Sequence, residues 1–358
     1  MNQLQTLGWS DERTEQFEPY LTQGFVPGRI AVQHRGVFVV GTEHGDLRAE
    51  VAGRLAHEAA SPAELPAVGD WVALAPRPDE GAATIHAVLP RRTAFSRKTA
   101  WHAVEEQVLA ANVDDVLLVM SLNEDFNPRR LERYLTLGWE SGARPAVVLT
   151  KADLHDAPEL AVLEVEAIAY GVPVHAVSVV TGEGLDALRA HVRPGCTLVF
   201  LGSSGVGKST LVNTLAGAEL LATNDLRADG RGRHTTTHRE LVVLPEGGIV
   251  IDTPGLRELQ LWEASDGLEE AFDDVASLAL ECRFADCSHS VEPGCAIRAA
   301  LAAGTLPHER WESYVKLQRE LAHLERKLDK RRHAEERRRW HTITADAKAA
   351  MRLKGRRV

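Results

Sequence analysis

Residues 202–209 are Gly-Ser-Ser-Gly-Val-Gly-Lys-Ser, a complete phosphate-binding loop of the pattern G-x-x-x-x-G-K-[ST]. The apolar run 196–201 before the loop predicts a buried strand, and 209–216 after it has helical spacing. In this context the glycines allow successive N–H groups to face phosphate oxygens, and the helix N-terminus favours an anion. The chain is therefore predicted to fold around a nucleotide site in an α/β domain.

The motif predicts a separate role for each of its polar residues. Lys208 is expected to reach the β- and γ-phosphates, and the Ser209 hydroxyl is expected to ligate Mg²⁺. The other residues expected to contact the nucleotide here are Gly202, Ser203, Ser204, Gly205, Val206, Gly207 and Thr210.

A second motif, Thr150-Lys151-Ala152-Asp153, follows the apolar run 146–149 and predicts guanine rather than adenine. A carboxylate at Asp153 accepts hydrogen bonds from guanine N1–H and the exocyclic amine, a donor pair that adenine lacks. The Lys151 stem is expected to lie along the base, and Ser178 to support it. Thr150 stands where many GTPases have Asn.

The third motif is Asp252-Thr-Pro-Gly255, after the apolar run 249–251. Asp252 is expected to hold Mg²⁺ and the Gly255 N–H to contact the γ-phosphate. One threonine of 235–237 should also ligate Mg²⁺, and we expect Thr236. Leu256 occupies the position where Ras-like enzymes have a water-orienting Gln, so hydrolysis by the chain alone should be slow.

His234, beside the threonines, is the candidate for orienting water, because a neutral imidazole accepts a hydrogen bond near pH 7. A structural role for His234 stays open. The predicted catalytic residues are therefore His234, Lys208 and Asp252.

The order of these motifs is unusual, because the guanine motif precedes the phosphate loop. A GTPase domain over 101–260 is therefore predicted to be circularly permuted, with strands and helices alternating in a mostly parallel sheet. The last motif then leads directly into the C-terminal region.

The region 25–100 has five short strand-like segments separated by turns, which predicts a small OB-like β-barrel after an N-terminal extension at 1–24. Segment 91–98 follows, with four cations around Phe95. It is either an RNA contact, with Phe95 stacking on a base, or a basic linker.

Residues 261–358 are predicted to form an α-helical zinc-binding domain with a basic C-terminal helix and tail. Cys282-x4-Cys287-x-His289-x5-Cys295 supplies four ligands with the Cys₃His composition of a closed structural zinc site. Pro307 opens a helix with apolar residues three and four apart, from Trp311 to Leu328.

Charge and composition limit the class of protein. The net charge is −10, yet 326–358 holds 13 Lys and Arg against 4 Asp and Glu. A basic tail on an acidic body suggests an anionic partner such as nucleic acid, or else a solvated helix end. We expect a cytoplasmic protein without a membrane partner, because no apolar run is long enough to span a bilayer and the N-terminus lacks a secretory signal. We also expect a monomer.

Taken together, the OB-like N-terminus, the permuted motifs and the Cys-x4-Cys-x-His-x5-Cys segment resemble the bacterial ribosome small subunit-dependent GTPase A family over roughly 25–330. The resemblance implies a GTPase that binds the small (30S) ribosomal subunit late in its maturation. It also implies that the subunit stimulates hydrolysis, that hydrolysis releases the protein, and that the barrel and zinc domain contact ribosomal RNA. The implied cofactors are GTP or GDP, Mg²⁺ and one structural Zn²⁺.

Two other hypotheses stay open at this point. One keeps the GTPase but makes it a signalling switch that acts away from the ribosome. The other is an RNA-binding module whose nucleotide site is only structural.

Overall fold

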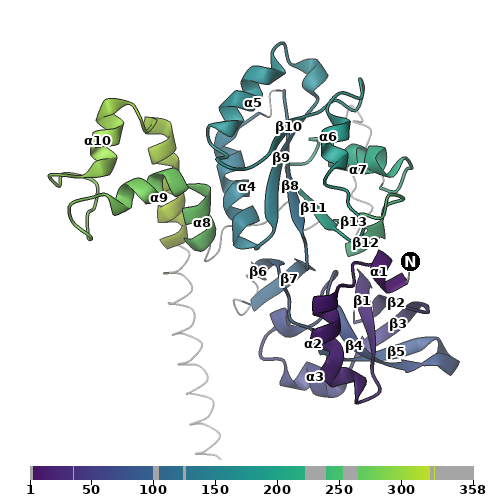
Figure 1. The fold of residues 1–358 in the computed structure, drawn as a ribbon. Coiled ribbons are helices and arrows are strands. Elements are labelled where there is room, and N and C mark those ends of the chain that lie inside the picture. Colours follow the sequence, from purple (N-terminus) through teal and green to yellow (C-terminus); the bar gives the residue numbers. More distant parts are fainter. Residues whose placement is uncertain are drawn as a thin grey trace, which may run out of the picture.

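The computed structural model describes residues 3–34, 36–99, 105–123, 126–221, 239–252, 265–322 and 326. Figure 1 shows an N-terminal barrel beside a sheet covered by helices, with a group of C-terminal helices against the far side of that sheet domain. The multidomain α/β fold predicted from the sequence is confirmed by these elements.

The N-terminal strands close into a five-stranded barrel. Strand β1 pairs with β2, β2 with β3, β3 in parallel with β5, β5 with β4, and β4 returns to β1. Ile30, Val40, Leu74 and Ile85 are fully buried and fill its interior. The predicted OB-like barrel is confirmed. Its strands are β1 Val26–Gln33, β2 Phe38–Thr42, β3 Gly45–Val51, β4 Trp71–Arg77 and β5 Ala82–Val88, with the short helices α3 Gly53–Glu58, η1 Pro62–Glu64 and η2 Pro78–Glu80 between them.

The second domain is built on strands in the order β10-β9-β8-β11-β13-β12. The first five are parallel, and β12 is antiparallel to β13. Every residue of β8 and β11 is buried, as expected for strands with helices on both faces. The strands are β8 Asp115–Ser121, β9 Arg144–Thr150, β10 Val174–Ala176, β11 Thr197–Leu201, β12 Arg239–Val243 and β13 Ile249–Asp252.

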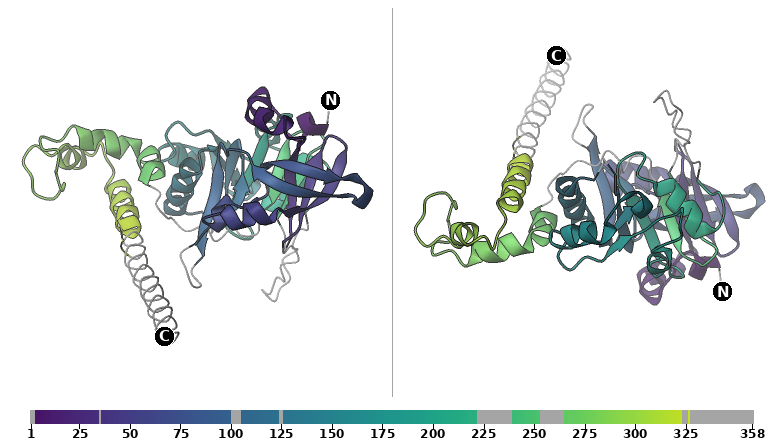
Figure 2. Two further views of the ribbon diagram at one scale, coloured as in Figure 1. Left: turned by 90° about the horizontal axis from the view of Figure 1, so that it is seen from below. Right: turned by 90° about the horizontal axis from the view of Figure 1, so that it is seen from above.

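Helices cover both faces of this sheet, as the views from above and below show (Figure 2). Helix α4 starts where the Asn127 side chain accepts a hydrogen bond from the Arg130 N–H, and Pro128 occupies its first turn. Helix α7 starts at Lys208 and is capped after Ala216 by Gly217, whose φ of 62° suits glycine. The helices are α4 Pro128–Glu140, η3 Ala152–Leu154, α5 Pro158–Glu166, α6 Leu185–Arg189 and α7 Lys208–Ala216.

The barrel and the second domain share one continuous sheet, since β1 also pairs with β12, where Val32 lies opposite Glu240. Arg239 on β12 donates to Gln33 Oε1 at 3.0 Å across this pairing. A separate two-stranded hairpin, β6 Ala94–Thr99 and β7 Glu105–Ala111, connects the two domains along the chain.

The N-terminal extension reinforces this junction with α1 Gln3–Thr6 and α2 Asp11–Leu21. Arg29, a fully buried residue of β1, donates to Leu7 O at 2.5 Å and to Thr197 Oγ1 at 2.9 Å. Arg13 of α2 donates to Asn112 Oδ1 at 2.6 Å. The extension, the barrel and the start of β11 are therefore joined by buried guanidinium groups.

Of the two alternatives for 91–98, an RNA contact or a basic linker, the RNA contact is contradicted at two residues. Phe95 is 2% exposed and packs in the core, so it cannot stack on a base. Arg91 forms an ion pair at 2.7 Å with the fully buried carboxylate of Asp70. Both side chains are therefore used within the fold, Phe95 in the hydrophobic core and Arg91 in an ion pair with a buried carboxylate.

The C-terminal region is helical, with α8 Ser265–Ala271, α9 Asp273–Leu280, α10 Ala296–Ala303 and a further helix at 308–322. Helix α8 lies directly against α4 (Figure 1). A Cβ at Gly267 would lie 2.3 Å from Thr136 O, so only glycine permits this approach. Of the predicted apolar stripe, Leu317 and Leu321 are buried, and Leu324 and Leu328 fall outside the described residues.

A buried arginine fixes the C-terminal region to α4. Arg310 Nη1 donates to Glu132 Oε1 at 3.0 Å, and both side chains are about 95% buried. Arg310 also pairs with Asp274 at 2.8 Å and lies over the Phe272 ring at 4.0 Å. Burial raises the pKa of Glu132, so this carboxylate depends on its cationic partner to stay ionised.

Among the described residues, no helix combines the length and apolarity needed to cross a bilayer.

Candidate nucleotide site and metal centre

The phosphate loop lies between β11 and α7, at the carboxyl end of the parallel strands. Gly205 and Gly207 have φ angles of 83° and 95°, and a Cβ at Gly202 would lie 2.2 Å from Val119 O. Glycine is therefore required at each of these positions. Lys208 Nζ donates to Gly202 O at 2.8 Å and Ser203 O at 2.5 Å, so its ammonium group lies over the loop.

The structure brings the motif at 150–153 against this loop, although the two are about fifty residues apart in sequence. Thr150 Oγ1 donates to Val206 O at 2.6 Å. Lys151, in a left-handed conformation with a φ of 59°, donates from Nζ to Gly205 O at 3.1 Å. The threonine that replaces asparagine therefore still connects the two motifs through the carbonyl of Val206.

Asp153 lies beside Ser178, the residue expected from the sequence to support the base. Ser178 is fully buried, and its hydroxyl donates to Asp153 Oδ1 at 2.5 Å. The Thr181 N–H donates in turn to Ser178 Oγ at 3.1 Å, and the Ala152 N–H donates to Val177 O at 3.1 Å. These bonds orient a carboxylate that remains exposed to a ligand.

The remaining predicted residues divide between described and undescribed parts of the chain. Asp252 ends β13, which is directly beside β11, and Ser209 and Thr210 are in the first turn of α7. Ser204 is an exposed residue of the loop. His234, Thr236 and Gly255 lie outside the described residues.

Sequence reasoning missed two residues of α4 that contact the phosphate loop. Arg130 Nη1 donates to Ser203 Oγ at 2.8 Å, and the Tyr134 hydroxyl lies 3.3 Å from the same atom. A positional signal was present, since α4 follows the strand β8, which pairs directly with β11. Residues that start a helix after such a strand lie at the same edge of the sheet as the loop.

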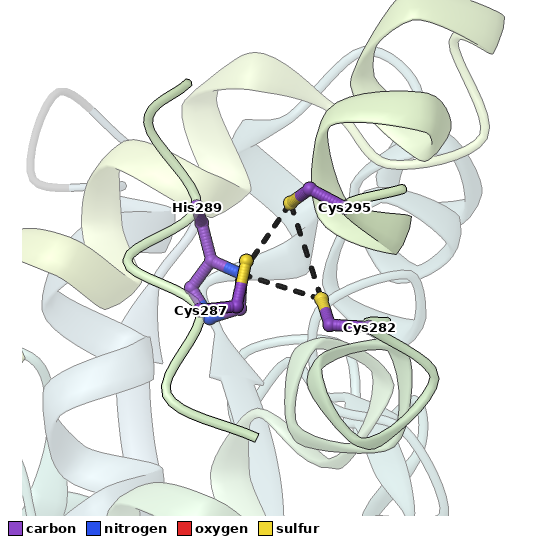
Figure 3. Close-up of side chains that lie close together, drawn as sticks. All are labelled: Cys282, Cys287, His289 and Cys295. Atoms are coloured by element: carbon purple, nitrogen blue, oxygen red, sulfur yellow. Dashed lines mark hydrogen bonds between the residues drawn. The ribbon is translucent and has the colours of Figure 1, made fainter. Parts of the chain in front are cut away.

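The four predicted zinc ligands converge at one point of the C-terminal region, with their ligand atoms within 4.8 Å of one another (Figure 3). Cys282 Sγ lies 3.9 Å from Cys295 Sγ, and each of these sulfur atoms lies 3.5 Å from His289 Nδ1. Tetrahedral bonds of about 2.3 Å to sulfur and 2.1 Å to nitrogen separate two sulfurs by roughly 3.8 Å and sulfur from nitrogen by roughly 3.6 Å. The donor set and its spacing therefore fit a structural Zn²⁺.

The surroundings of this cluster hold the ligands in place. His289 has a φ of 59°, and its ring packs edge-on against Trp311 at 5.6 Å. Cys295 caps α10, where its sulfur accepts from the Arg298 N–H at 3.5 Å. Burial and the neighbouring sulfurs of Cys295 and Cys282 raise the pKa of the Cys287 thiol to about 11. A bound cation would lower this pKa, because it stabilises the thiolate.

A phosphate loop whose guanine-type motif precedes it in sequence but lies against it in space defines a circularly permuted P-loop GTPase fold. The family model described as RsgA GTPase matches residues 88–262. The curated protein "Small ribosomal subunit biogenesis GTPase RsgA" of Opitutus terrae is 50% identical over 363 residues, covering 99% of each chain. This chain belongs to the RsgA GTPase family.

Other relatives support the same assignment. The protein of the same name from Streptomyces coelicolor is 47% identical over 355 residues, covering 98% of this chain and 95% of the relative. Among solved structures, YjeQ from Thermotoga maritima has a TM-score of 0.64 at 28% identity, covering 83% of this chain and 99% of that one. YloQ, titled a circularly permuted GTPase, has a TM-score of 0.60 at 25% identity over 83% and 95% of the two chains.

Family membership decides between the earlier hypotheses. An RNA-binding module with an inert nucleotide site is wrong, because the family is one of GTP hydrolases. The names of these relatives refer to biogenesis of the small ribosomal subunit and not to signalling.

Proposed function

We propose that this protein hydrolyses GTP to GDP and phosphate while it is bound to the small (30S) ribosomal subunit, late in the maturation of that subunit, and that hydrolysis releases it. The observation that carries the nucleotide part of this proposal is the Asp153 carboxylate, held by Ser178 beside a phosphate loop that Thr150 and Lys151 contact directly. The names of the full-length relatives support the ribosomal part.

In this proposal the residues of the site divide the work of binding and hydrolysis. Asp153 selects guanine by accepting hydrogen bonds from its N1–H and its amine. The backbone N–H groups of the phosphate loop donate to the phosphate oxygens. Lys208, which already lies over the loop, moves a short distance from the carbonyls of Gly202 and Ser203 to the β- and γ-phosphates.

Magnesium would be held by Ser209, Thr236 and Asp252. It supplies neutralisation of the charge that develops on the phosphate oxygens. His234 would orient the attacking water, since Leu256 has no polar group for that purpose. Structural zinc would be held by Cys282, Cys287, His289 and Cys295, where it contributes folding energy to a small, loop-rich segment.

We further propose four functional units. These are the N-terminal extension 1–24, the barrel 25–100, the GTPase domain 101–260 and the zinc-binding region 261–358. The barrel and the zinc-binding region contact ribosomal RNA, the protein acts as a monomer, and it works in the cytoplasm. The basic segment 326–358 adds an electrostatic contribution to RNA binding.

The test is the affinity of the protein for purified 30S subunits, measured with a non-hydrolysable GTP analogue and with GDP across a salt series. We expect tighter binding with the analogue and a steep loss of affinity with salt. Equal affinity for both nucleotide forms would refute release by hydrolysis, and a flat salt response would remove the electrostatic RNA contact.

A further inference from the structure

Helix α4 contacts the phosphate loop with one face and the C-terminal region with another. Arg130 and Tyr134 are one helical turn apart and both face Ser203. Arg133, in the same turn, makes a two-point contact with Glu320 of the helix at 308–322, at 2.8 and 2.7 Å. Glu132 pairs with Arg310, as described above. A third face, with Leu131 and Leu135, is buried against the sheet.

We propose that Arg130 is a positioning residue for the phosphate loop, acting through Ser203, and that docking of the C-terminal region on α4 sets its position and thereby the affinity for GTP. This inference rests on the proposed GTPase function and adds a route by which the zinc-binding region regulates the nucleotide site. The route runs through a described helix and is separate from the covalent connection after Asp252.

Ser203 connects Arg130 on α4 to Lys208 of the phosphate loop. Its hydroxyl accepts from Arg130 at 2.8 Å, and its backbone carbonyl accepts from Lys208 Nζ at 2.5 Å. A shift of α4 therefore moves a residue of the phosphate loop that also contacts the Lys208 ammonium group. Hydrogen bonds from charged donors are roughly twice as strong as neutral ones, so Arg130 suits this role better than Tyr134 alone.

The contacts between α4 and the C-terminal region are strong enough to keep α4 in place. The Arg133–Glu320 pair is bidentate, and each side chain is only about one third exposed. The pair Glu132–Arg310 is almost completely buried. Gly267 brings α8 so close to Thr136 that the two helices cannot slide past one another without separating. Displacing the C-terminal region, for instance on a ribosomal surface, would therefore displace α4.

The experiment measures GTP and GDP affinity and single-turnover hydrolysis for the full-length zinc-loaded protein without ribosomal subunits. Arg130→Ala and Ser203→Ala should each weaken GTP binding about tenfold, the scale of one lost charge-assisted hydrogen bond. The double variant should be no worse than Ser203→Ala, because Ser203→Ala already removes the contact with Arg130. Arg130→Lys should restore part of the affinity.

The decisive variants are distant from the nucleotide. Glu320→Ala and Arg133→Ala should weaken GTP binding about threefold in the same direction, and this effect should disappear in the Arg130→Ala background. The charge-reversed pair Arg133→Glu with Glu320→Arg should restore affinity. Glu312→Ala is the matched control, because its pair with Arg129 joins the same two helices but is 3.8 Å long and exposed.

Zinc content and hydrogen exchange of 265–322 identify any variant that loses its fold, and Glu320→Gln then replaces Glu320→Ala. If Glu320 and Arg133 variants bind GTP like Glu312→Ala, the regulatory route is wrong. Additive effects of Arg130→Ala and Ser203→Ala would overturn the positioning role. Neither result bears on the ribosome, whereas a wild-type protein that binds no GTP would refute the proposed function instead.

Discussion

Replacing Arg310 by Met removes the charge at the centre of the contact between α4 and the C-terminal region while keeping most of the side-chain volume. Arg310 is 95% buried, and it pairs with Glu132, which is 96% buried. Its guanidinium also donates to Ala271 O at 2.7 Å and lies over the Phe272 ring. Asp274 is 40% exposed, so its carboxylate can recover water contacts after the substitution.

The expected loss of stability is about 4 kcal/mol, because removing one partner of a buried ion pair leaves an uncompensated charge that costs about 3–5 kcal/mol. Burial already raises the pKa of Glu132, and loss of its cation raises this pKa further. The folded protein then binds a proton at Glu132 more readily than the unfolded chain does. Stability of the variant should therefore rise as pH falls into the window between the unfolded and folded pKa values.

The assay is hydrogen exchange in peptides from 265–322, with peptides from the barrel at 26–88 as the internal control. Arg310→Met should speed exchange in the first set and not in the second, and Glu132→Gln added to it should recover part of the loss, since no buried charge then remains unpaired. A loss below about 1 kcal/mol, or a double variant no better than the single one, would refute the argument that this pair fixes the C-terminal region.

Three further predictions follow from other parts of the structure. Asp153→Asn should lose GTP affinity and gain affinity for xanthosine triphosphate, since Asn donates to the carbonyl that xanthine has in place of the guanine amine. Normal GTP binding by the variant, measured with fluorescent nucleotides, would contradict this role of Asp153. Removing zinc with a chelator should unfold 280–296, seen by hydrogen exchange, and leave nucleotide binding largely intact. Metal analysis that finds no zinc in protein purified without chelator would exclude the site. Burial acts to raise the pKa of Asp115, but His191, Arg144 and Arg193 together lower it, so its charge stabilises the fold above about pH 4 and this contribution is lost as pH falls through the folded pKa. Asp115→Asn should accordingly destabilise the protein at neutral pH, and denaturant titrations should show its difference from wild type shrinking in acid; a difference independent of pH would contradict the assignment.

The local motifs were predictable because their chemistry is contained in a few consecutive residues. The turn of the phosphate loop needs glycine where φ is positive, and Gly205 and Gly207 meet that need. The zinc ligands lie within one short segment, so their convergence in Figure 3 followed from spacing alone. The parallel strands of the second domain were predictable because buried parallel strands are continuous apolar runs.

The contacts between distant segments were not predictable in the same way. Segment 91–98 has the composition of an exposed basic patch. Only the tertiary structure shows that Phe95 is buried in the core and that Arg91 pairs with a buried carboxylate. The pairing of β1 with β12 joins residues about 200 positions apart, which no local pattern encodes. Arg130 illustrates the same limit at the site, because its partner Ser203 is 73 residues away.

The measurement that tests the central claim most directly is GTP turnover by the purified protein with and without purified 30S subunits. We predict slow turnover by the protein alone, since Leu256 replaces a water-orienting residue, and a large increase with the subunits. Lys208→Ala should abolish both activities, because Lys208 is the residue of the phosphate loop expected to reach the β- and γ-phosphates. Turnover that 30S subunits leave unchanged, or that persists in Lys208→Ala, would contradict the account.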